Sequence, residues 1–220
     1  MATGSISWTK FKKDALEIIR HSGRIHDGWQ FTTIQLGKEE PGFLQKKNVQ
    51  RLLKTIQTQN SAHTSNKTVA MATVNEEQDS WEKDLEEDYS SVDSHSKSAS
   101  WCIYEYHVVY SLSYGVPVLY FNASKEDGRL LSLEEVWNNV NENYQSSVVL
   151  DRWSFITQQE HPLLCRPFYQ IHPCHTADMM KATGIDWNQT ECNYLVTWLS
   201  SLGPVVGLQL DLSYGTLDTG

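Results

Sequence analysis

Long apolar runs and closely spaced cysteines are missing from this sequence of 220 residues. No segment approaches the roughly 18 to 20 apolar residues that cross a membrane, and the N-terminus, MATGSISWTKFKKDALEI, has no apolar stretch suited to a signal peptide. We therefore expect a soluble, cytoplasmic protein. The four cysteines are widely spaced, which favours free thiols over disulfides. Because free cysteine is usually buried, three of them are expected to be buried structural residues: Cys102, Cys165 and Cys192.

The sequence also lacks a basic surface pattern. Its formal net charge is −9, and residues 76 to 93, with nine acidic residues and one lysine, carry all but one unit of that charge. Outside this run the chain is nearly neutral, and it shows no stripe of lysine and arginine with interleaved aromatic residues. Nucleic acid is therefore not an expected partner.

The acidic run belongs to a longer stretch, residues 55 to 100, that is poor in large apolar residues. Such a segment buries too little apolar surface to offset the entropy that it would lose on ordering. We interpret it as a flexible, variable insertion, whose acidic residues form either a solvated loop or a docking site for a basic partner. The chain from residue 1 to residue 220 is then expected to be a single domain that this insertion interrupts.

What is present is a pattern of helices and strands typical of an α+β fold. Apolar residues recur at helical spacing in SISWTKFKKDALEIIRHS, which predicts a helix over residues 5–22 that Gly23 stops. Short strands are expected in GWQFTTIQ and GFLQKKNVQ. The run WCIYEYHVVYSLSY alternates tyrosine and valine on one face with Glu105, His107 and Ser111 on the other, and PVLYFNA follows it, so we expect two long antiparallel strands.

The last third of the chain gives weaker signals. Ser132 and Glu135 form a capping box that opens a helix. Three prolines in ITQQEHPLLCRPFYQIHPCHT predict an extended, irregular segment. After it, ADMMKATG predicts one or two helical turns, and NYLVTWLSSLG predicts a helix that ends at Gly203. The apolar tail VVGLQLDL is expected to pack against the core.

Cys174, in FYQIHPCHT, is the residue best placed for chemistry. A thiolate is stabilised by positive or donor-rich surroundings, and Cys174 lies between His172 and His175, before a predicted helix start. Spacing alone leaves a nucleophile, a zinc ligand and a buried structural cysteine open, although zinc is disfavoured because no second pair of closely spaced ligands exists. His161 and His172 each precede a proline, and we expect them to orient their loops through hydrogen bonds to the backbone.

Several motifs taken together resemble a known family. TQQEHPL, from residue 157 to residue 163, is followed by Pro167, by HPCH at residues 172 to 175, and by Met179 and Met180. This series resembles the signature of the autophagy enzymes that act like ubiquitin-conjugating enzymes, of which one branch modifies a lipid headgroup and the other a protein lysine. The blocks YEYHVVYSLSYGVPVLYFNASKEDGRLLSLEEVW and YLVTWLSSLGPVVGLQLDLSY are similar to the protein-lysine branch. The resemblance runs from Trp101 to Tyr214 and, more faintly, through the N-terminal helix.

The resemblance implies a ubiquitin-conjugating-like α+β fold, with an antiparallel sheet flanked by helices, and a transferase activity that needs no cofactor and no metal. It implies that Cys174 takes a ubiquitin-like modifier, autophagy-related protein twelve, from the activating enzyme, autophagy-related protein seven. The modifier is held as a thioester through its C-terminal glycine and then passes to a lysine of autophagy-related protein five. This chemistry requires an exposed thiolate and donors for the oxyanion.

One departure from ordinary ubiquitin-conjugating enzymes concerns those donors. Such enzymes have an asparagine after His-Pro, whereas here His161 and Pro162 are followed by Leu163, which leaves the donor unidentified. His172 is expected either to supply a donor or to shape the loop, and His161 is a second supporting candidate. The strands at residues 101 to 121 are expected to offer an exposed edge to which the acceptor protein docks.

Three alternatives to protein-lysine transfer remain open from the sequence. The first is transfer of the modifier to phosphatidylethanolamine. The second is a cysteine hydrolase with His161 or His172 as base, which requires a third group to orient the base. The third is a non-catalytic scaffold that binds through the strands at residues 101 to 121.

Overall fold

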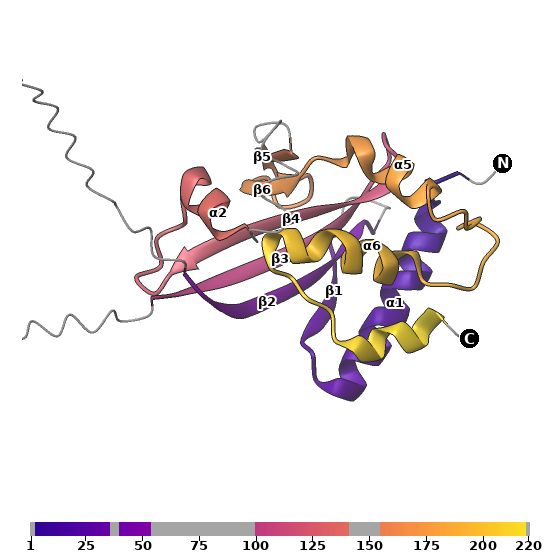
Figure 1. Cartoon of the computed structure of the whole chain (residues 1–220), viewed down its shortest axis with the longest axis horizontal. Helices are drawn as coiled ribbons and strands as arrows, with labels where there is room; N and C mark the ends of the chain where they lie inside the picture. The colour runs from indigo at the N-terminus through magenta and orange to yellow at the C-terminus, as the bar shows by residue number, and fades with distance from the viewer. Residues whose placement is uncertain (1–2, 36–39, 54–99, 141–154, 219–220) are drawn as a thin grey trace, which may run out of the picture. The chain divides into compact units, whose positions relative to one another are not determined.

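The computed structural model describes residues 3–35, 40–53, 100–140 and 155–218. Within these ranges, six antiparallel strands form one sheet in the order β1-β2-β3-β4-β6-β5 (Figure 1). The strands are β1 (Trp29–Thr33), β2 (Gly42–Leu52), β3 (Trp101–Ser111), β4 (Val116–Lys125), β5 (Ile156–Glu160) and β6 (Pro167–Ile171). The expected α+β class with an antiparallel sheet is confirmed. The insertion expected at residues 55 to 100 lies, except for its last residue, outside the described ranges, so it and the single-domain organisation stay predictions.

Helices and short 3₁₀ turns accompany the sheet. They are α1 (Trp8–Ile25), α2 (Leu133–Asn139), η2 (Pro173–His175), α5 (Thr176–Lys181), α6 (Tyr194–Leu202), η3 (Gly203–Val206) and η4 (Leu212–Asp218). None of the helices in the described part of the chain has the length and apolar character that crossing a membrane requires.

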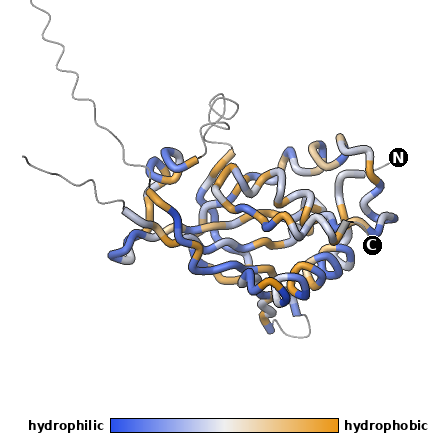
Figure 2. Tube along the Cα trace, turned by 60° about the horizontal axis from the view of Figure 1, so that its bottom comes forward, coloured by the Kyte–Doolittle hydropathy of each residue, from blue (hydrophilic) through white to orange (hydrophobic). Residues whose placement is uncertain are grey.

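The first helix runs further than its sequence predicts. Ser7 caps its start, since the hydroxyl accepts a hydrogen bond from the amide of Lys10 at 3.1 Å. The predicted stop at Gly23 is wrong, because a glycine inside a helix costs only about 1 kcal/mol. The chain instead leaves the helix at His26, which adopts the left-handed conformation with φ of 56°. Hydrophilic and hydrophobic positions interleave along the helices and strands in Figure 2, as expected for elements that bury one side.

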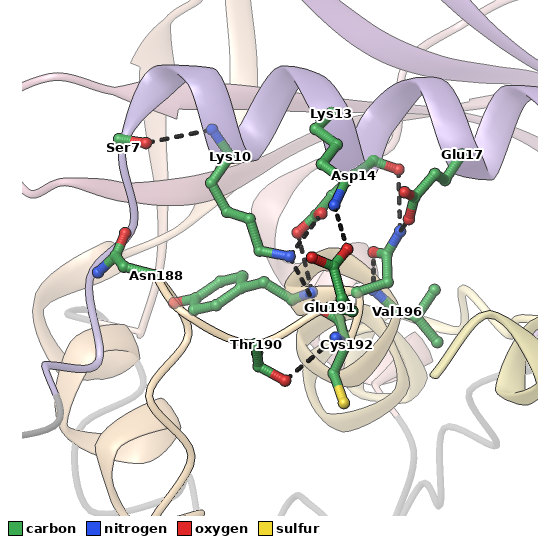
Figure 3. Close-up of polar contacts among 12 residues, drawn as sticks. Ser7, Lys10, Lys13, Asp14, Glu17, Asn188, Thr190, Glu191, Cys192 and Val196 are labelled. Carbon is green, nitrogen blue, oxygen red and sulfur yellow. Dashed lines mark hydrogen bonds and ion pairs between the residues drawn. The ribbon is translucent and has the colours of Figure 1, made fainter. Parts of the chain in front are cut away.

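A buried polar cluster joins α1 to the start of α6 (Figure 3). Lys10 Nζ lies 2.9 Å from Asp14 Oδ1 and donates a hydrogen bond to the carbonyl of Cys192 at 2.7 Å. Asp14 Oδ2 accepts a hydrogen bond from the amide of Tyr194 at 2.9 Å. Asp14 is fully buried, and this desolvation raises its pKa to about 6. We call these four residues the α1–α6 clamp.

The two long strands expected from the sequence are β3 and β4. They pair from Cys102 opposite Lys125 to Ser111 opposite Val116. However, β2 pairs with the other side of β3, and β6 pairs with the other side of β4. The exposed docking edge expected at residues 101 to 121 is therefore wrong, because both strands lie inside the sheet. The edge strands are β1 and β5.

The segment expected to be irregular is instead the hairpin of β5 and β6. The two strands pair from Ile156 opposite Ile171 to Glu160 opposite Pro167. Its prolines do not interrupt the pairing, because each stands where no ladder donor is needed: Pro162 lies in the hairpin loop, Pro167 is the first residue of β6, and Pro173 opens η2.

The other local predictions are confirmed. Ser132 and Glu135 form the capping box at the start of α2, where the Glu135 carboxylate accepts from the Ser132 amide at 2.8 Å. The expected helical turns after Cys174 are α5, and the expected last helix is α6. In the tail that follows, Val205, Val206 and Leu208 are buried in the core, and Leu210 packs partly buried against it.

Candidate functional site

Cys174 lies in the turn that follows β6. The strand ends at Ile171, His172 continues in an extended conformation, and the next three residues form the single 3₁₀ turn η2 before α5 begins. Pro173 suits the first position of this turn because the turn needs no donor there. Cys174 is exposed and its thiol is free. The interpretation of Cys174 as a buried structural cysteine is therefore wrong, and its sulfur is open to a substrate.

His172 holds the backbone of this turn. Its Nδ1 accepts a hydrogen bond from the amide of Cys174 at 3.2 Å, so the expected backbone hydrogen bond is confirmed. A nitrogen that accepts carries no proton, which places the imidazole proton on Nε2. The ring of Tyr114, from the connection between β3 and β4, meets the His172 ring nearly edge-on, with the centroids 6.0 Å apart.

An apolar pocket with a volume of about 300 Å³ adjoins the thiol. Its lining residues come from β5, β6, η2, α5 and α6 or from positions next to them, and they are Phe155, Ile171, His172, Cys174, His175, Thr176, Met179 and Leu202. We call this cavity the Cys174 pocket. Its apolar walls were missed by sequence reasoning, because Phe155, Met179 and Leu202 are far apart along the chain and carry no shared motif.

His161 lies in the other His-Pro turn, between β5 and β6. Its Nδ1 accepts hydrogen bonds from the amides of Leu163 and Leu164, each at 3.2 Å. Its own amide donates to the carbonyl of Arg166 at 2.9 Å, which closes the hairpin loop. The expected orienting role is thus confirmed for His161 as well. Unlike Cys174, however, the side chain of His161 is fully buried.

A chain of hydrogen-bonded side chains, of which both histidines are buried, continues from the second nitrogen of His161. Nε2 of His161 lies 3.1 Å from Nδ1 of His107, and Nε2 of His107 lies 2.9 Å from a carboxylate oxygen of Glu105. Because an ionised carboxylate only accepts, each histidine donates from Nε2 toward Glu105 and accepts at Nδ1. The hydrogen bond from His107 lowers the pKa of Glu105 to about 2, and burial lowers that of His161 to about 4. We call these three residues the Glu105 chain.

The two His-Pro turns lie at opposite ends of β6. Five residues at about 3.3 Å each separate the turns by roughly 17 Å. This length excludes a direct contact between His161 and Cys174, so a supporting role for His161 can only be indirect. Leu163 also lies at the far end, where it lines a larger apolar pocket of about 670 Å³. Leu163, which follows His161 and Pro162, therefore does not reach Cys174.

The remaining cysteines differ from one another. Cys102 is buried, as expected, and Cys192 is partly buried. Cys165 is exposed, in the loop of His161 and with φ of 52°, so its expected burial is wrong. None of the four forms a disulfide bond. Among the described residues, no three His, Cys, Asp or Glu side chains are grouped as a metal ion would require.

Comparison with known proteins matches nearly the whole chain. The family described as "Autophagocytosis associated protein, active-site domain" matches residues 10–213. The chain is 36% identical over 208 residues to the ubiquitin-like-conjugating enzyme ATG10 of Homo sapiens. The aligned region covers 93% of this chain and 90% of the human protein. It is also 41% identical over 114 residues to the protein of that name from Arabidopsis thaliana (50% of this chain, 51% of that protein). The Dictyostelium discoideum protein of that name is 39% identical over 124 residues (49% and 52%).

Proposed function

Because the chain belongs to the family of autophagocytosis-associated proteins with this active-site domain, and is a ubiquitin-like-conjugating enzyme of autophagy, we propose that Cys174 is its catalytic nucleophile. The observation that carries the proposal is the exposure of the Cys174 thiol beside an apolar pocket, in a turn held by His172. The α+β fold of the family, ubiquitin-conjugating-like, supplies the rigid frame for that turn.

Two acyl transfers make up the proposed reaction. In the first, the Cys174 thiolate attacks the carbonyl carbon of the modifier's C-terminal glycine, which is held as a thioester on the activating enzyme. The new S–C bond forms as the activating enzyme's thiolate leaves. In the second, a neutral lysine amine of the acceptor attacks the same carbonyl, an amide forms, and the Cys174 thiolate leaves. The amine loses its proton to a base or to water.

His172 has two nitrogens for two tasks in this proposal. Nδ1 holds the amide of Cys174 and so fixes the backbone from which the thiol projects. Nε2 carries a proton and is the donor that this residue can offer to the oxyanion formed in each transfer. The two roles expected as alternatives from the sequence, shaping the loop and supplying a donor, are therefore compatible in one side chain.

The proposed partners are those that the family resemblance implies. The modifier is autophagy-related protein twelve, the activating enzyme is autophagy-related protein seven, and the acceptor is a lysine of autophagy-related protein five. These proteins meet in the cytoplasm. No cofactor enters the proposed reaction, because both transfers exchange one acyl bond for another.

The test is a charging reaction with the activating enzyme, the modifier and ATP. The wild-type protein should form a conjugate that thiol reductant cleaves, and Cys174→Ser should form an ester that resists it. Cys165→Ser is the matched control, since Cys165 is the other exposed cysteine and follows the other His-Pro turn. It should charge like wild type. A reductant-cleaved conjugate on Cys174→Ser would show that another cysteine is the nucleophile.

Further arms of the same experiment separate the alternatives. When autophagy-related protein five and phosphatidylethanolamine vesicles are both added, the product that forms distinguishes transfer to lysine from transfer to lipid. Turnover of a thioester without the activating enzyme would favour a hydrolase. Of the two candidate bases, His161 is the one with an orienting group behind it, and it lies about the length of β6 away from Cys174, which disfavours that outcome. Normal autophagy with Cys174→Ala would favour a scaffold.

A further inference from the structure

We infer that the Cys174 pocket binds the side chain of the residue that precedes the modifier's C-terminal glycine, and that this residue is large and apolar. The inference rests on the proposed role of Cys174 and adds a specificity site to it. The pocket would then select which ubiquitin-like protein can be charged.

The walls of the pocket define the chemistry of its occupant. Four of the eight lining side chains are apolar: Phe155, Ile171, Met179 and Leu202. Ile171 and Thr176 are buried and form its inner part, whereas Met179 and Leu202 are partly exposed. A volume of about 300 Å³ equals roughly ten waters at about 30 Å³ each, enough for one large aromatic or long aliphatic side chain.

The absence of carboxylates from the lining excludes the second substrate as the occupant. Two groups must reach the sulfur of Cys174, namely the modifier's C-terminus and the acceptor's amine. An amine in this pocket would lose its hydration and find no acidic side chain among the eight lining residues. The same holds for the amine of a lipid headgroup. The apolar cavity therefore suits the modifier.

The position of the pocket selects one residue of the modifier. The acyl residue is glycine in the proposed reaction and has no side chain to fill a cavity. The α-carbon of the preceding residue lies about 3.8 Å from that of the glycine, and the side chains alternate in direction along an extended tail. The first side chain that can enter a cavity beside the thioester is therefore the penultimate one. Met179 is suited to this contact, because its flexible thioether adapts to aromatic and aliphatic groups alike.

A probe that needs no activating enzyme tests the inference. Short peptides ending in X-Gly, with a vinyl methyl ester in place of the glycine carboxylate, would react directly with Cys174 of the full chain. The thiolate adds to the β-carbon of the double bond, and the α-carbon takes a proton from water. The rates for X of Phe, Leu and Ala are measured by mass spectrometry in a Cys165→Ser background, which removes the other exposed thiol. We expect Phe and Leu to react roughly tenfold to a hundredfold faster than Ala.

Variants that fill the cavity should erase this preference. Met179→Trp and Leu202→Trp should bring the Phe to Ala rate ratio close to one, and two positions protect the test against one misfolded variant. Leu210→Trp is the matched control, since Leu210 packs partly buried against the same core but does not line the pocket. It should keep the wild-type ratio. Equal rates for the three peptides on the unfilled protein, or an unchanged ratio in both filled variants, would overturn the inference.

The two proposals fail separately in these experiments. If the protein discriminates among the probes but is never charged by the activating enzyme, the inference about the pocket is supported and the conjugating role of Cys174 is contradicted. If the protein is charged on Cys174 yet reacts equally with all three probes, the conjugating role is supported and the inference about the pocket is contradicted. A natural modifier with a glycine, alanine or serine before its last residue would also contradict the inference.

Discussion

At one end of β6 the imidazole of His161 accepts hydrogen bonds from backbone amides, and at the other end that of His172 does the same at the same distance, 3.2 Å. In both turns a proline follows the histidine, and the residue after the proline donates its amide. The surroundings differ. His161 is fully buried and joins the Glu105 chain, whereas His172 is partly exposed and borders the Cys174 pocket.

The difference teaches that the His-Pro turn is a device for holding a backbone, not a catalytic motif in itself. The imidazole substitutes for a missing backbone acceptor, as short polar side chains do in other turns. What the turn then does depends on the third residue and on its exposure. The turn with the buried His161 has Leu163 as its third residue and closes the β5–β6 hairpin. The turn with the partly exposed His172 has Cys174 as its third residue and presents a thiol at the surface.

The largest effect is expected when the cysteine is moved from one turn to the other. In a protein with Cys174→Ala and Leu163→Cys, the second His-Pro turn would carry a cysteine at the corresponding place. We expect no charging above background, because that place lies roughly 17 Å from the Cys174 pocket. A non-reducing gel of the charging reaction measures the outcome.

The control for this transfer is Leu163→Cys with Cys174 intact, which should charge normally and shows that the substitution is tolerated. A reductant-cleaved conjugate on the relocated cysteine would break the comparison, because the turn alone would then suffice for chemistry.

Replacing each histidine should have a smaller effect. In the turn of His161 the effect falls mainly on stability, and in the turn of His172 it falls mainly on the rate of charging. His161→Ala leaves the amide of Leu163 and one nitrogen of His107 without their partner, and it removes one of the two acceptors of the Leu164 amide, so it should lower the free energy of unfolding by about 3 kcal/mol. His172→Ala should cost less than about 1 kcal/mol in stability, yet slow charging roughly tenfold or more.

Urea unfolding and single-turnover charging measure the two quantities on the same samples. His172→Asn sharpens the comparison. Its side-chain oxygen can still accept from the amide of Cys174, whereas its NH2 group ends one bond short of the place that Nε2 occupies in histidine. If Asn restores charging fully, loop shaping explains the role of His172. A stability loss in His172→Ala as large as that in His161→Ala would contradict the division of roles.

The third effect is a pH dependence that belongs to the buried turn. Burial lowers the pKa of His161 to about 4, below the roughly 6.5 of the unfolded chain. Its contribution to stability is therefore fully present above about pH 6.5 and is lost as the pH falls toward 4, by on the order of 2 to 3 kcal/mol. Glu105, with its pKa lowered to about 2, adds a loss only below about pH 4.5.

Asp14 of the α1–α6 clamp opposes this trend. Its pKa is raised to about 6, so its contribution is present below about pH 4 and is lost as the pH rises through 6. The comparison is therefore made between wild type and His161→Asn, which keeps an acceptor in the turn but does not titrate. The free energy of unfolding between pH 4 and 6.5 should rise less steeply in the variant. Equal slopes would show that folding does not lower the pKa of His161.

Features decided by nearby residues could be predicted from the sequence. The capping box of Ser132 and the two long strands are such cases, because each depends on residues a few positions apart or on simple alternation. The end of α1 was misplaced since the backbone angle at His26, and not the presence of Gly23, decides where the helix stops. The sequence does not predict the β5–β6 hairpin, because proline usually interrupts a strand, whereas Pro167 stands at the first position of one, where proline is tolerated.

The site was predictable only in part for a similar reason. Cys174 was singled out by its neighbours and by the family resemblance, but spacing could not decide whether it is exposed. One part of the Glu105 chain could be predicted from the sequence. Glu105 and His107 are two positions apart in a strand, so their side chains lie on the same face. Their link to His161 depends on the packing of a distant hairpin against that face, which no local pattern reports.

The α1–α6 clamp also bears on how the chain is made. The carboxylate of Asp14 receives its backbone hydrogen bond from Tyr194, 180 residues later. At roughly 5 to 20 residues per second, a ribosome takes about 9 to 36 s to add those residues. During that time the first helix carries an aspartate that has its Lys10 partner but no Tyr194 amide to bury it against. The α1–α6 clamp can therefore close only after Tyr194 has been added, whereas the packing of α1 against β1, which follows it directly in the chain, can form much earlier.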